Sequence, residues 1–281
     1  MRDIVWPGGA LRLSERTHIM GVVNVTPDSF SDGGMFLDPA DAIEHGIRLA
    51  EEGADALDVG GESTRPGADP VGADDEIARA VPVIEGLAKS VEVPISIDTT
   101  KSAVARAALD AGASIINDVS AGRLDPSILT LAAERDVPVI LMHMLGEPRT
   151  MQRDPIYDDV VEDVRAFLVS RAQAAADAGV DPGRIVIDPG IGFGKTPQHN
   201  LTLLKRLRDL THPGYPVLLG ASRKSFIGLT LDLPVEERLE GTLATTAVGI
   251  LNGASMVRVH DVRANLRAAR IVDAVVRAGD R

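Results

Sequence analysis

The chain has 281 residues, and its 41 acidic and 29 basic side chains give a formal net charge of −12 at pH 7. This charge excludes binding to nucleic acid through a general basic surface, although a local pocket for an anion is compatible with it. Cysteine is absent, which excludes disulfides, thiolate metal sites and cysteine nucleophiles. The first ten residues do not resemble a signal peptide and no apolar run could span a membrane, so we expect a cytoplasmic protein.

Short apolar runs without alternation recur along the chain, and most of them precede a helical pattern. Such runs are typical of strands that are buried on both faces. We expect strands at Ile19–Val25, Ala56–Gly60, Pro94–Asp98, Ser114–Val119, Pro138–Met142, Ile185–Asp188, Pro216–Ala221 and Met256–His260. The helical patterns between them include Ala40–Glu52, Ile77–Lys89, Ala103–Ala111, Val160–Ala178 and Leu239–Leu251.

Eight strands that alternate with helices predict an α/β protein with the (β/α)₈ architecture of the TIM barrel, at about 35 residues per unit. A doubly wound open sheet has the same local pattern and is the alternative. Ile4–Trp6 and Leu11–Leu13 flank a Pro-Gly-Gly turn, which predicts a short β-hairpin that covers the bottom of the barrel. No linker-like tract divides the chain. We therefore expect a single domain, with the hairpin in residues 1–17 and the barrel in residues 18–278.

A polar residue lies at or just after the end of each predicted strand. In a (β/α)₈ barrel these positions face the carboxyl-terminal mouth, where active sites are built. One such residue alone is equally well explained as a helix cap or a loop hydrogen bond, but eight are not. The eight residues are Asn24, Glu62, Asp98, Asn117, His143, Asp188, Ser222 and His260.

These residues and their neighbours also sort by chemistry. One set is cationic or can become so, and predicts an anion site: Arg65, Lys224, Arg258 and His260. Another set suits the amino-lactam edge of a heterocycle: Asp98, Asn117 and Asp188. The sequence therefore favours a substrate with a polar heterocycle at one end and an anion at the other. The alternative interpretation is a set of scattered surface ion pairs.

Three segments after strands have an unusual composition. Thr26–Gly34 and Gly61–Asp69 are long and rich in Gly, Pro and Ser, so we expect them to act as lids over a substrate. Asp188–Thr196 contains several glycines but does not match the P-loop spacing, which argues against a nucleoside triphosphate. Phe193 lies among these glycines and is one of only eight aromatic residues, so we expect it to contact a ligand.

Eight segments carry a resemblance to a known family. They are GVVNVTPDSFSDGG (Gly21–Gly34), GGESTRPGA (Gly60–Ala68), SIDT (Ser96–Thr99), INDVS (Ile116–Ser120), LMHMLGEPRTMQ (Leu141–Gln152), DPGIGFGKT (Asp188–Thr196), GASRKSFIG (Gly220–Gly228) and RVHDV (Arg258–Val262). In this order, from about residue 20 to 265, they resemble the dihydropteroate synthase family of folate biosynthesis. One departure is Ala121, where that family usually has Gly.

The resemblance implies a transferase that joins 6-hydroxymethyl-7,8-dihydropterin diphosphate to 4-aminobenzoate and releases diphosphate, with Mg²⁺ as cofactor and a homodimer formed through barrel helices. It implies that Asn24 contacts the metal ion, and that Arg258 and His260 join Asn24 at the diphosphate. The pterin-binding set would be Asp98, Asn117, Asp188 and Lys224. Thr64, Arg65 and Pro66 belong to the second lid, where Arg65 would join the diphosphate site. The aminobenzoate pocket would be built from Thr64, Pro66, Phe193, Lys224 and Ser225, with Ser225 at the carboxylate. Met142 and Phe193 would be apolar walls, and the catalytic residues would be Asp98, Lys224, Arg258 and His260.

The chemistry of this reaction favours early loss of diphosphate. The reacting methylene is attached to an electron-rich ring, so a cation forms before the amine attacks, as in an SN1 reaction, and Asp98 would stabilise it. Two other functions remain open. A methyltetrahydrofolate-binding methyltransferase shares this type of barrel, but the STRPG and RVHDV segments argue against it. A non-catalytic pterin-binding homologue is the other, against which the intact polar set argues.

Overall fold

The computed structural model describes residues 3–26, 38–63, 67–147, 149–212 and 214–278. Eight parallel strands lie side by side in the order β8-β7-β6-β5-β4-β3-β10-β9. Their bounds are β3 His18–Asn24, β4 Ala56–Gly60, β5 Ile95–Asp98, β6 Ile115–Asp118, β7 Val139–Met142, β8 Ile185–Asp188, β9 Leu218–Leu219 and β10 Met256–Val259. A parallel bridge between Ile187 and Val217 joins the two outer strands. The sheet is therefore a barrel, and the alternative of an open sheet is wrong.

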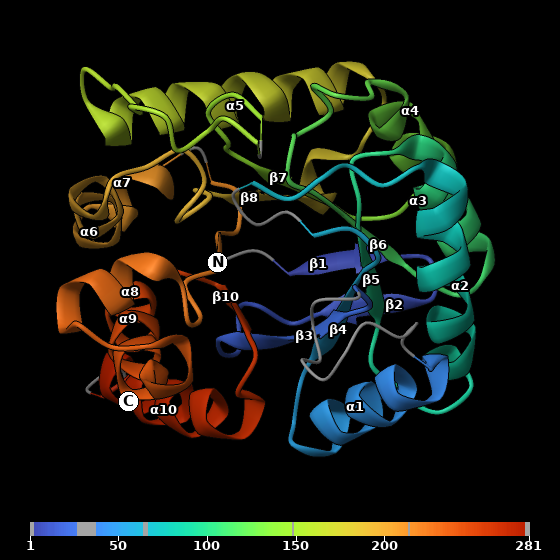
Figure 1. The fold of residues 1–281 in the computed structure, drawn as a ribbon, viewed down its shortest axis with the longest axis horizontal. Coiled ribbons are helices and arrows are strands. Elements are labelled where there is room, and N and C mark those ends of the chain that lie inside the picture. Colours follow the sequence, from blue (N-terminus) through green and yellow to red (C-terminus); the bar gives the residue numbers. More distant parts are fainter. Residues whose placement is uncertain (1–2, 27–37, 64–66, 148, 213, 279–281) are drawn as a thin grey trace.

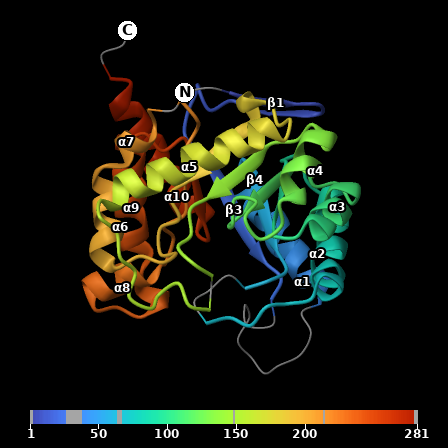
Figure 2. The same ribbon diagram turned by 90° about the horizontal axis from the view of Figure 1, so that it is seen from above.

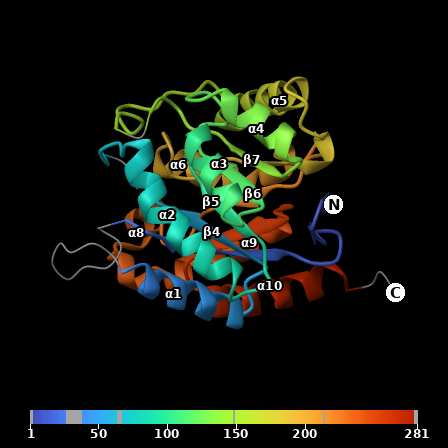
Figure 3. The same ribbon diagram turned by 90° about the vertical axis from the view of Figure 1, so that its right-hand side faces the viewer.

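Helices surround the strands on all sides (Figures 1 and 3). They are α1 Pro39–Glu51, α2 Ala73–Ala88, α3 Ser102–Asp110, α4 Ser127–Arg135, α5 Val160–Asp177, α6 Pro197–Lys205, α7 Leu207–Leu210, α8 Ser225–Leu231, α9 Leu239–Leu251 and α10 Val262–Val276, with the short 3₁₀ helices η1 Pro182–Arg184 and η2 Val235–Glu237. Within the described part of the chain, no helix is long and apolar enough to cross a membrane.

Within the barrel, one helix and one strand have bounds that differ from the predicted ones. Helix α2 begins four residues before the predicted start at Ile77, since Gly72 precedes a first turn rich in acidic side chains, which the helix dipole favours there. The seventh strand was predicted over Pro216–Ala221, but β9 covers only two of these residues. On one side β9 pairs with β10 over two residues, and on the other the barrel closes through the bridge between Ile187 and Val217. Little regular pairing is therefore available to lengthen β9.

The N-terminal hairpin closes one end of the barrel, as predicted. Its second strand was predicted over Leu11–Leu13 but covers Gly9–Leu11, because pairing of Trp6 with Gly9 leaves only Pro7 and Gly8 in the turn. Strands β1 (Ile4–Trp6) and β2 (Gly9–Leu11) pair antiparallel and lie across that end (Figure 2). Their side chains join one buried cluster with residues near the amino-terminal ends of the barrel strands, which include Met20, Ala56, Ile115 and Met256. This apolar plug fills the lower half of the barrel interior.

The barrel interior becomes polar toward the opposite end. Side chains at alternate strand positions point to the same face, so Asp58 stands one layer above Ala56, and Arg258 one layer above Met256. Asn117 follows Ile115 in the same way. These polar side chains are buried or nearly so and meet above the apolar plug. Burial of polar groups is costly unless they are paired, so this layer identifies the candidate site.

Candidate active site

Arg258 is the centre of the polar layer. Its Nε donates to Asp58 Oδ2 at 2.6 Å, and one terminal nitrogen donates to Asp98 Oδ2 at 2.9 Å. The two carboxylates come from β4 and β5, two and three strands away from β10, so the guanidinium reaches across the barrel mouth. Its side chain is 22% exposed, while those of Asp58 and Asp98 are 0% and 7% exposed. Both ion pairs are thus nearly excluded from water.

Asp58 links this ion-pair cluster to Asn117, whose amide nitrogen donates to the same Oδ2 atom at 3.0 Å. Asp58 was not among the predicted site residues. In the sequence, Asp58 is a single carboxylate inside the apolar run of β4. It lies two residues before the strand end and is therefore not one of the polar residues at strand ends. The second oxygens of Asp58 and Asp98 are buried and have no hydrogen-bond partner among the described residues. Buried acceptors of this kind are normally satisfied, so they suit a ligand that carries N–H donors.

Burial and the neighbouring charges together shift the pKa of Asp98. Burial raises the pKa of Asp98 to about 7, even though Arg258 lowers it, and the neighbouring Asp58 raises it further. Burial disfavours the charge of Arg258 as well, but Asp58 and Asp98 outweigh that effect and raise its pKa. Consequently Asp98 changes its charge near neutral pH, whereas Arg258 stays cationic.

Asp188 and Lys224 form the second part of the site. Asp188 ends β8, and its Oδ1 accepts from the backbone N–H of Gly190 at 2.7 Å. Burial raises the pKa of Asp188 and lowers the pKa of Lys224 to about 8, and each charge partly offsets the shift of the other. A side-chain carbon at Gly220 would lie 3.7 Å from Lys224 Nζ and 3.8 Å from Asp188 Oδ2. It would also lie 4.0 Å from Arg258 Cβ, so Gly220 leaves space where the three side chains converge.

An apolar wall borders this space. The Lys224 ammonium lies 4.6 Å from the centroid of the Phe193 ring, within the range of a cation–π interaction. Phe193 in turn packs against a small buried cluster that contains Met142 and Met144. The structure thus places Phe193 beside Lys224, and Met142 in the cluster behind Phe193.

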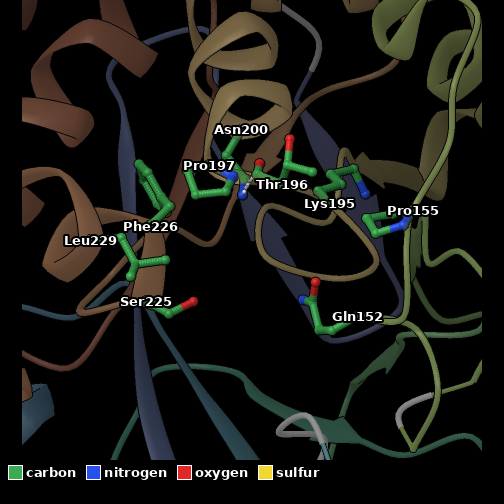
Figure 4. A pocket seen from close by; sticks show the side chains of 9 residues that line it. All are labelled: Gln152, Pro155, Lys195, Thr196, Pro197, Asn200, Ser225, Phe226 and Leu229. Carbon is green, nitrogen blue, oxygen red and sulfur yellow. Dashed lines mark hydrogen bonds between the residues drawn. The ribbon is translucent and has the colours of Figure 1, made fainter.

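Two further predicted residues lie at the ends of β9 and β10. His260 Nδ1 and Ser222 Oγ are 3.0 Å apart, and the His260 backbone N–H donates to the same hydroxyl at 3.2 Å. Ser225 is exposed at the start of α8 and lines a cavity with a volume of about 330 Å³. Figure 4 shows Ser225, Phe226 and Leu229 on one side of this cavity and Gln152 and Pro155 on another.

Not every polar residue at a strand end belongs to the site. Glu62 accepts from Lys101 Nζ at 2.6 Å and from the backbone of Val71, away from Arg258. His143 packs edge-on against Phe167 of α5 and lies 2.9 Å from Lys195 Nζ. Thr64, Arg65 and Pro66 lie outside the described residues, as does most of the predicted lid Thr26–Gly34. Asn24 ends β3 next to Gly60 and Asp98, half-buried at the mouth.

A (β/α)₈ barrel with a buried arginine, paired carboxylates and a lysine at its carboxyl-terminal mouth has the architecture of an enzyme that acts on a small polar molecule. The family model described as pterin binding enzyme matches residues 20–260. The chain is 47% identical over 270 residues to the dihydropteroate synthase of Bacillus subtilis, which covers 96% of this chain and 92% of that protein. The chain belongs to the dihydropteroate synthase family, whose members are transferases.

Solved structures agree with this assignment. A Yersinia pestis dihydropteroate synthase with a sulfonamide drug has a TM-score of 0.94 and 42% identity, covering 98% of this chain and 100% of that chain. The Xanthomonas albilineans dihydropteroate synthase with 4-aminobenzoic acid has a TM-score of 0.91 and 48% identity, and covers 98% of both chains. The same enzyme with 7,8-dihydropteroate has a TM-score of 0.87 and 45% identity, again covering 98% of both.

Proposed function

We propose that this chain condenses 6-hydroxymethyl-7,8-dihydropterin diphosphate with 4-aminobenzoate to give 7,8-dihydropteroate and diphosphate. The observation that carries the proposal is the convergence of Asp188, Lys224 and Arg258 on the space beside Gly220. The complexes of the Xanthomonas enzyme with 4-aminobenzoic acid and with 7,8-dihydropteroate support the same substrate classes here.

The pterin would lie with its amino-lactam edge against Asp188. That edge presents an amino group and a ring N–H side by side, and a carboxylate can accept from both. Asp188 is 5% exposed, so a ligand without these donors would leave a buried charge unpaired and would be rejected. Asn117 and the unpartnered oxygen of Asp98 would face the same ring, with Met142 as a wall, while Phe193 would border the aminobenzoate.

In the reaction, the bond between the methylene carbon and the diphosphate oxygen breaks before the new carbon–nitrogen bond forms. Ionised Asp98 stabilises the positive charge on the pterin ring, while Arg258 and His260 stabilise the negative charge of the departing diphosphate. The amine of 4-aminobenzoate then attacks the carbon and loses one proton. No covalent bond to the protein is required.

The mouth also fits a magnesium ion that is held partly by the substrate. Asn24 offers an amide oxygen, which is the type of ligand that Mg²⁺ prefers, and Mg²⁺ commonly binds one or two protein oxygens together with substrate phosphate. Within the described residues, no three His, Cys, Asp or Glu side chains are arranged to hold a metal ion by themselves. When bound, the ion would neutralise charge on the leaving diphosphate.

We also infer a cytoplasmic homodimer that forms through α9 and α10. These two helices pack together and leave apolar side chains exposed: Val248 and Leu251 on α9, and Ile271, Val275 and Val276 on α10. Ile271 is 69% exposed. An apolar surface of this kind on one face suits a second copy of the chain. Sedimentation should give a dimer for the wild type and a monomer for Ile271→Asp; a monomeric wild type would contradict the inference.

The test of the activity is an assay of diphosphate release. Wild-type enzyme should release diphosphate and form dihydropteroate only when pterin diphosphate, 4-aminobenzoate and Mg²⁺ are all present. A chain that binds the pterin by calorimetry but releases no diphosphate would instead be a non-catalytic pterin-binding homologue. Asp188→Asn serves as the control, because it should remove both binding and turnover.

A further inference from the structure

The loop Gly190–Gly194 is held by an unusual set of side-chain hydrogen bonds. Each of its five successive carbonyl oxygens accepts from a side chain. Lys195 Nζ donates to Gly190 and Phe193 at 3.0 Å each, and Tyr157 donates to Gly194 at 2.7 Å. The remaining donors are Gln152, to Gly192, and Lys224, to Ile191. The conformation of this loop is therefore set largely by side chains from other segments and by Lys195.

The loop needs these donors because it cannot supply them itself. Gly190, Gly192 and Gly194 have φ values of 65°, 86° and 64°, a left-handed conformation that prevents regular pairing of the backbone. One internal bond, from the Phe193 N–H to the Gly190 carbonyl at 3.0 Å, crosses the loop. Buried carbonyl groups without a partner are costly, so the side-chain donors stabilise this one arrangement.

Lys195 is the only one of these donors that binds two of the carbonyls. Its side chain is buried, 3% exposed, and its third contact is His143 Nδ1 at 2.9 Å. Among the described residues, none of its hydrogen-bond partners is a carboxylate. Burial lowers its pKa well below the usual value, and burial together with Lys195 lowers the pKa of His143 to about 2. The Lys195 nitrogen can donate to both carbonyls and share one further hydrogen with His143 Nδ1, so its three contacts are complementary without a counter-ion.

The loop carries two groups of the proposed site. Phe193 forms the ring beneath the Lys224 ammonium, and the Ile191 carbonyl accepts from the same ammonium. Lys195 also lines the cavity of about 330 Å³ together with Gln152 and Ser225 (Figure 4), so it contacts both the loop and this cavity.

We propose that Lys195 is a positioning residue of the reaction, which fixes Phe193 and Lys224 through the backbone of Gly190–Gly194. The inference rests on the proposed function, in which Phe193 borders the aminobenzoate and Lys224 lies between the two substrates. Lys195 acts on the reaction only through the loop. Its loss is expected to weaken the aminobenzoate pocket more than the pterin edge, because Asp188 belongs to β8 and meets the loop at the Gly190 N–H, next to the strand end.

The experiment compares Lys195→Met with Leu203→Ala, a control that truncates a fully buried side chain of α6 and removes none of the hydrogen bonds to the loop. Lys195→Met should raise the KM for 4-aminobenzoate at least tenfold, with kcat reduced less than threefold and pterin affinity within threefold of the wild type. Lys195→Gln keeps two N–H donors and should restore part of the lost affinity. Amide hydrogen exchange in residues 190–196 should accelerate at least tenfold in Lys195→Met and stay unchanged in the control.

The outcomes separate a positioning role from a general loss of stability. An unchanged KM and unchanged exchange in Lys195→Met would overturn the proposal, as would an equal rise of KM in Leu203→Ala. If Lys195→Met does not fold, Tyr157→Phe is the alternative variant, because it removes the donor to the Gly194 carbonyl. It should raise the KM for 4-aminobenzoate by a smaller factor. No rise would overturn the proposal. The exchange measurement does not need turnover, so a wild type without activity would refute the proposed function while the loop is still tested.

Discussion

Asp58→Asn is the most informative single substitution, because it removes one buried charge and keeps the shape of the side chain. Asp58 Oδ2 accepts from both Arg258 and Asn117, and the first of these bonds joins two ionised groups. Charge-assisted hydrogen bonds contribute about 1.5–3 kcal/mol, and the new amide nitrogen would be buried without an acceptor among the described residues. We expect a loss of roughly 2–3 kcal/mol, which is about a 30- to 150-fold decrease in kcat/KM.

The same substitution should change the pH dependence. The charge of Asp58 raises the pKa of Asp98, which stands at about 7, so its removal lowers that pKa. Because ionised Asp98 supports the reaction, kcat/KM of the wild type should rise with pH through about 7, and in Asp58→Asn this acid limb should move to lower pH. The contribution of Asp98 to the stability of the fold has the opposite pH dependence to kcat/KM. The pKa of Asp98 is higher in the folded than in the unfolded chain, so protonation of Asp98 favours folding. This contribution to stability is complete below about pH 3.9 and is lost as the pH rises through about 7.

The assay is the pH profile of kcat/KM between about pH 5.5 and 8.5, together with thermal unfolding. Asp55→Asn is the matched control: Asp55 also pairs with an arginine, Arg16, but lies before β4 at the opposite end of the barrel. The control should lose stability without moving the acid limb. An acid limb that stays in place or moves to higher pH in Asp58→Asn would refute the electrostatic coupling of the two carboxylates.

Two further predictions concern Asp188 and Lys224 of the site, and a third concerns the ion pairs of Lys101 outside it. Asp188→Asn should abolish pterin binding with the fold intact; calorimetric affinity within about threefold of the wild type, roughly 0.7 kcal/mol, would contradict the assigned role. Activity should fall above about pH 8, where Lys224 loses its proton, and a profile without this alkaline limb would exclude a required ammonium. Lys101→Met should lower the free energy of unfolding by about 3 kcal/mol in urea titrations, because it leaves Glu62 and the fully buried Glu76 without their shared cation. An equal loss in the double variant with Glu76→Gln would argue against that reason.

The strands and their ends were predictable because both depend on local patterns. An apolar run buried on both faces and a polar residue at its end can be read without knowing how the barrel closes. The length of β9 could not be predicted in this way. It depends on how β8 and β10 approach the last strand across the closure, and that pairing joins segments far apart in the chain.

The position of a residue at a strand end did not decide whether it belongs to the site, since successive side chains point to opposite faces. Met142 pairs with Asp188 in the register of β7 and β8, and both lie on the site side. His143 follows Met142 and therefore points outward, where it meets Phe167 of α5. The same alternation accounts for Asp58, which lies two residues before Gly60 on the inner face. Residue parity along the strand, combined with the register, would have found Asp58 and excluded His143.

Arg258 is connected to both ends of the proposed substrate, and this limits what its removal can reveal. A guanidinium has five N–H donors, and within the described residues one is used by Asp58 and another by Asp98. The others can serve a diphosphate without breaking either ion pair. Replacing Arg258 by alanine would leave two buried carboxylates unpaired beside the pterin ring, so binding of the pterin and of the diphosphate would weaken together. Substitution of Ser222, which contacts His260 and neither carboxylate, is therefore the better way to perturb the diphosphate end alone.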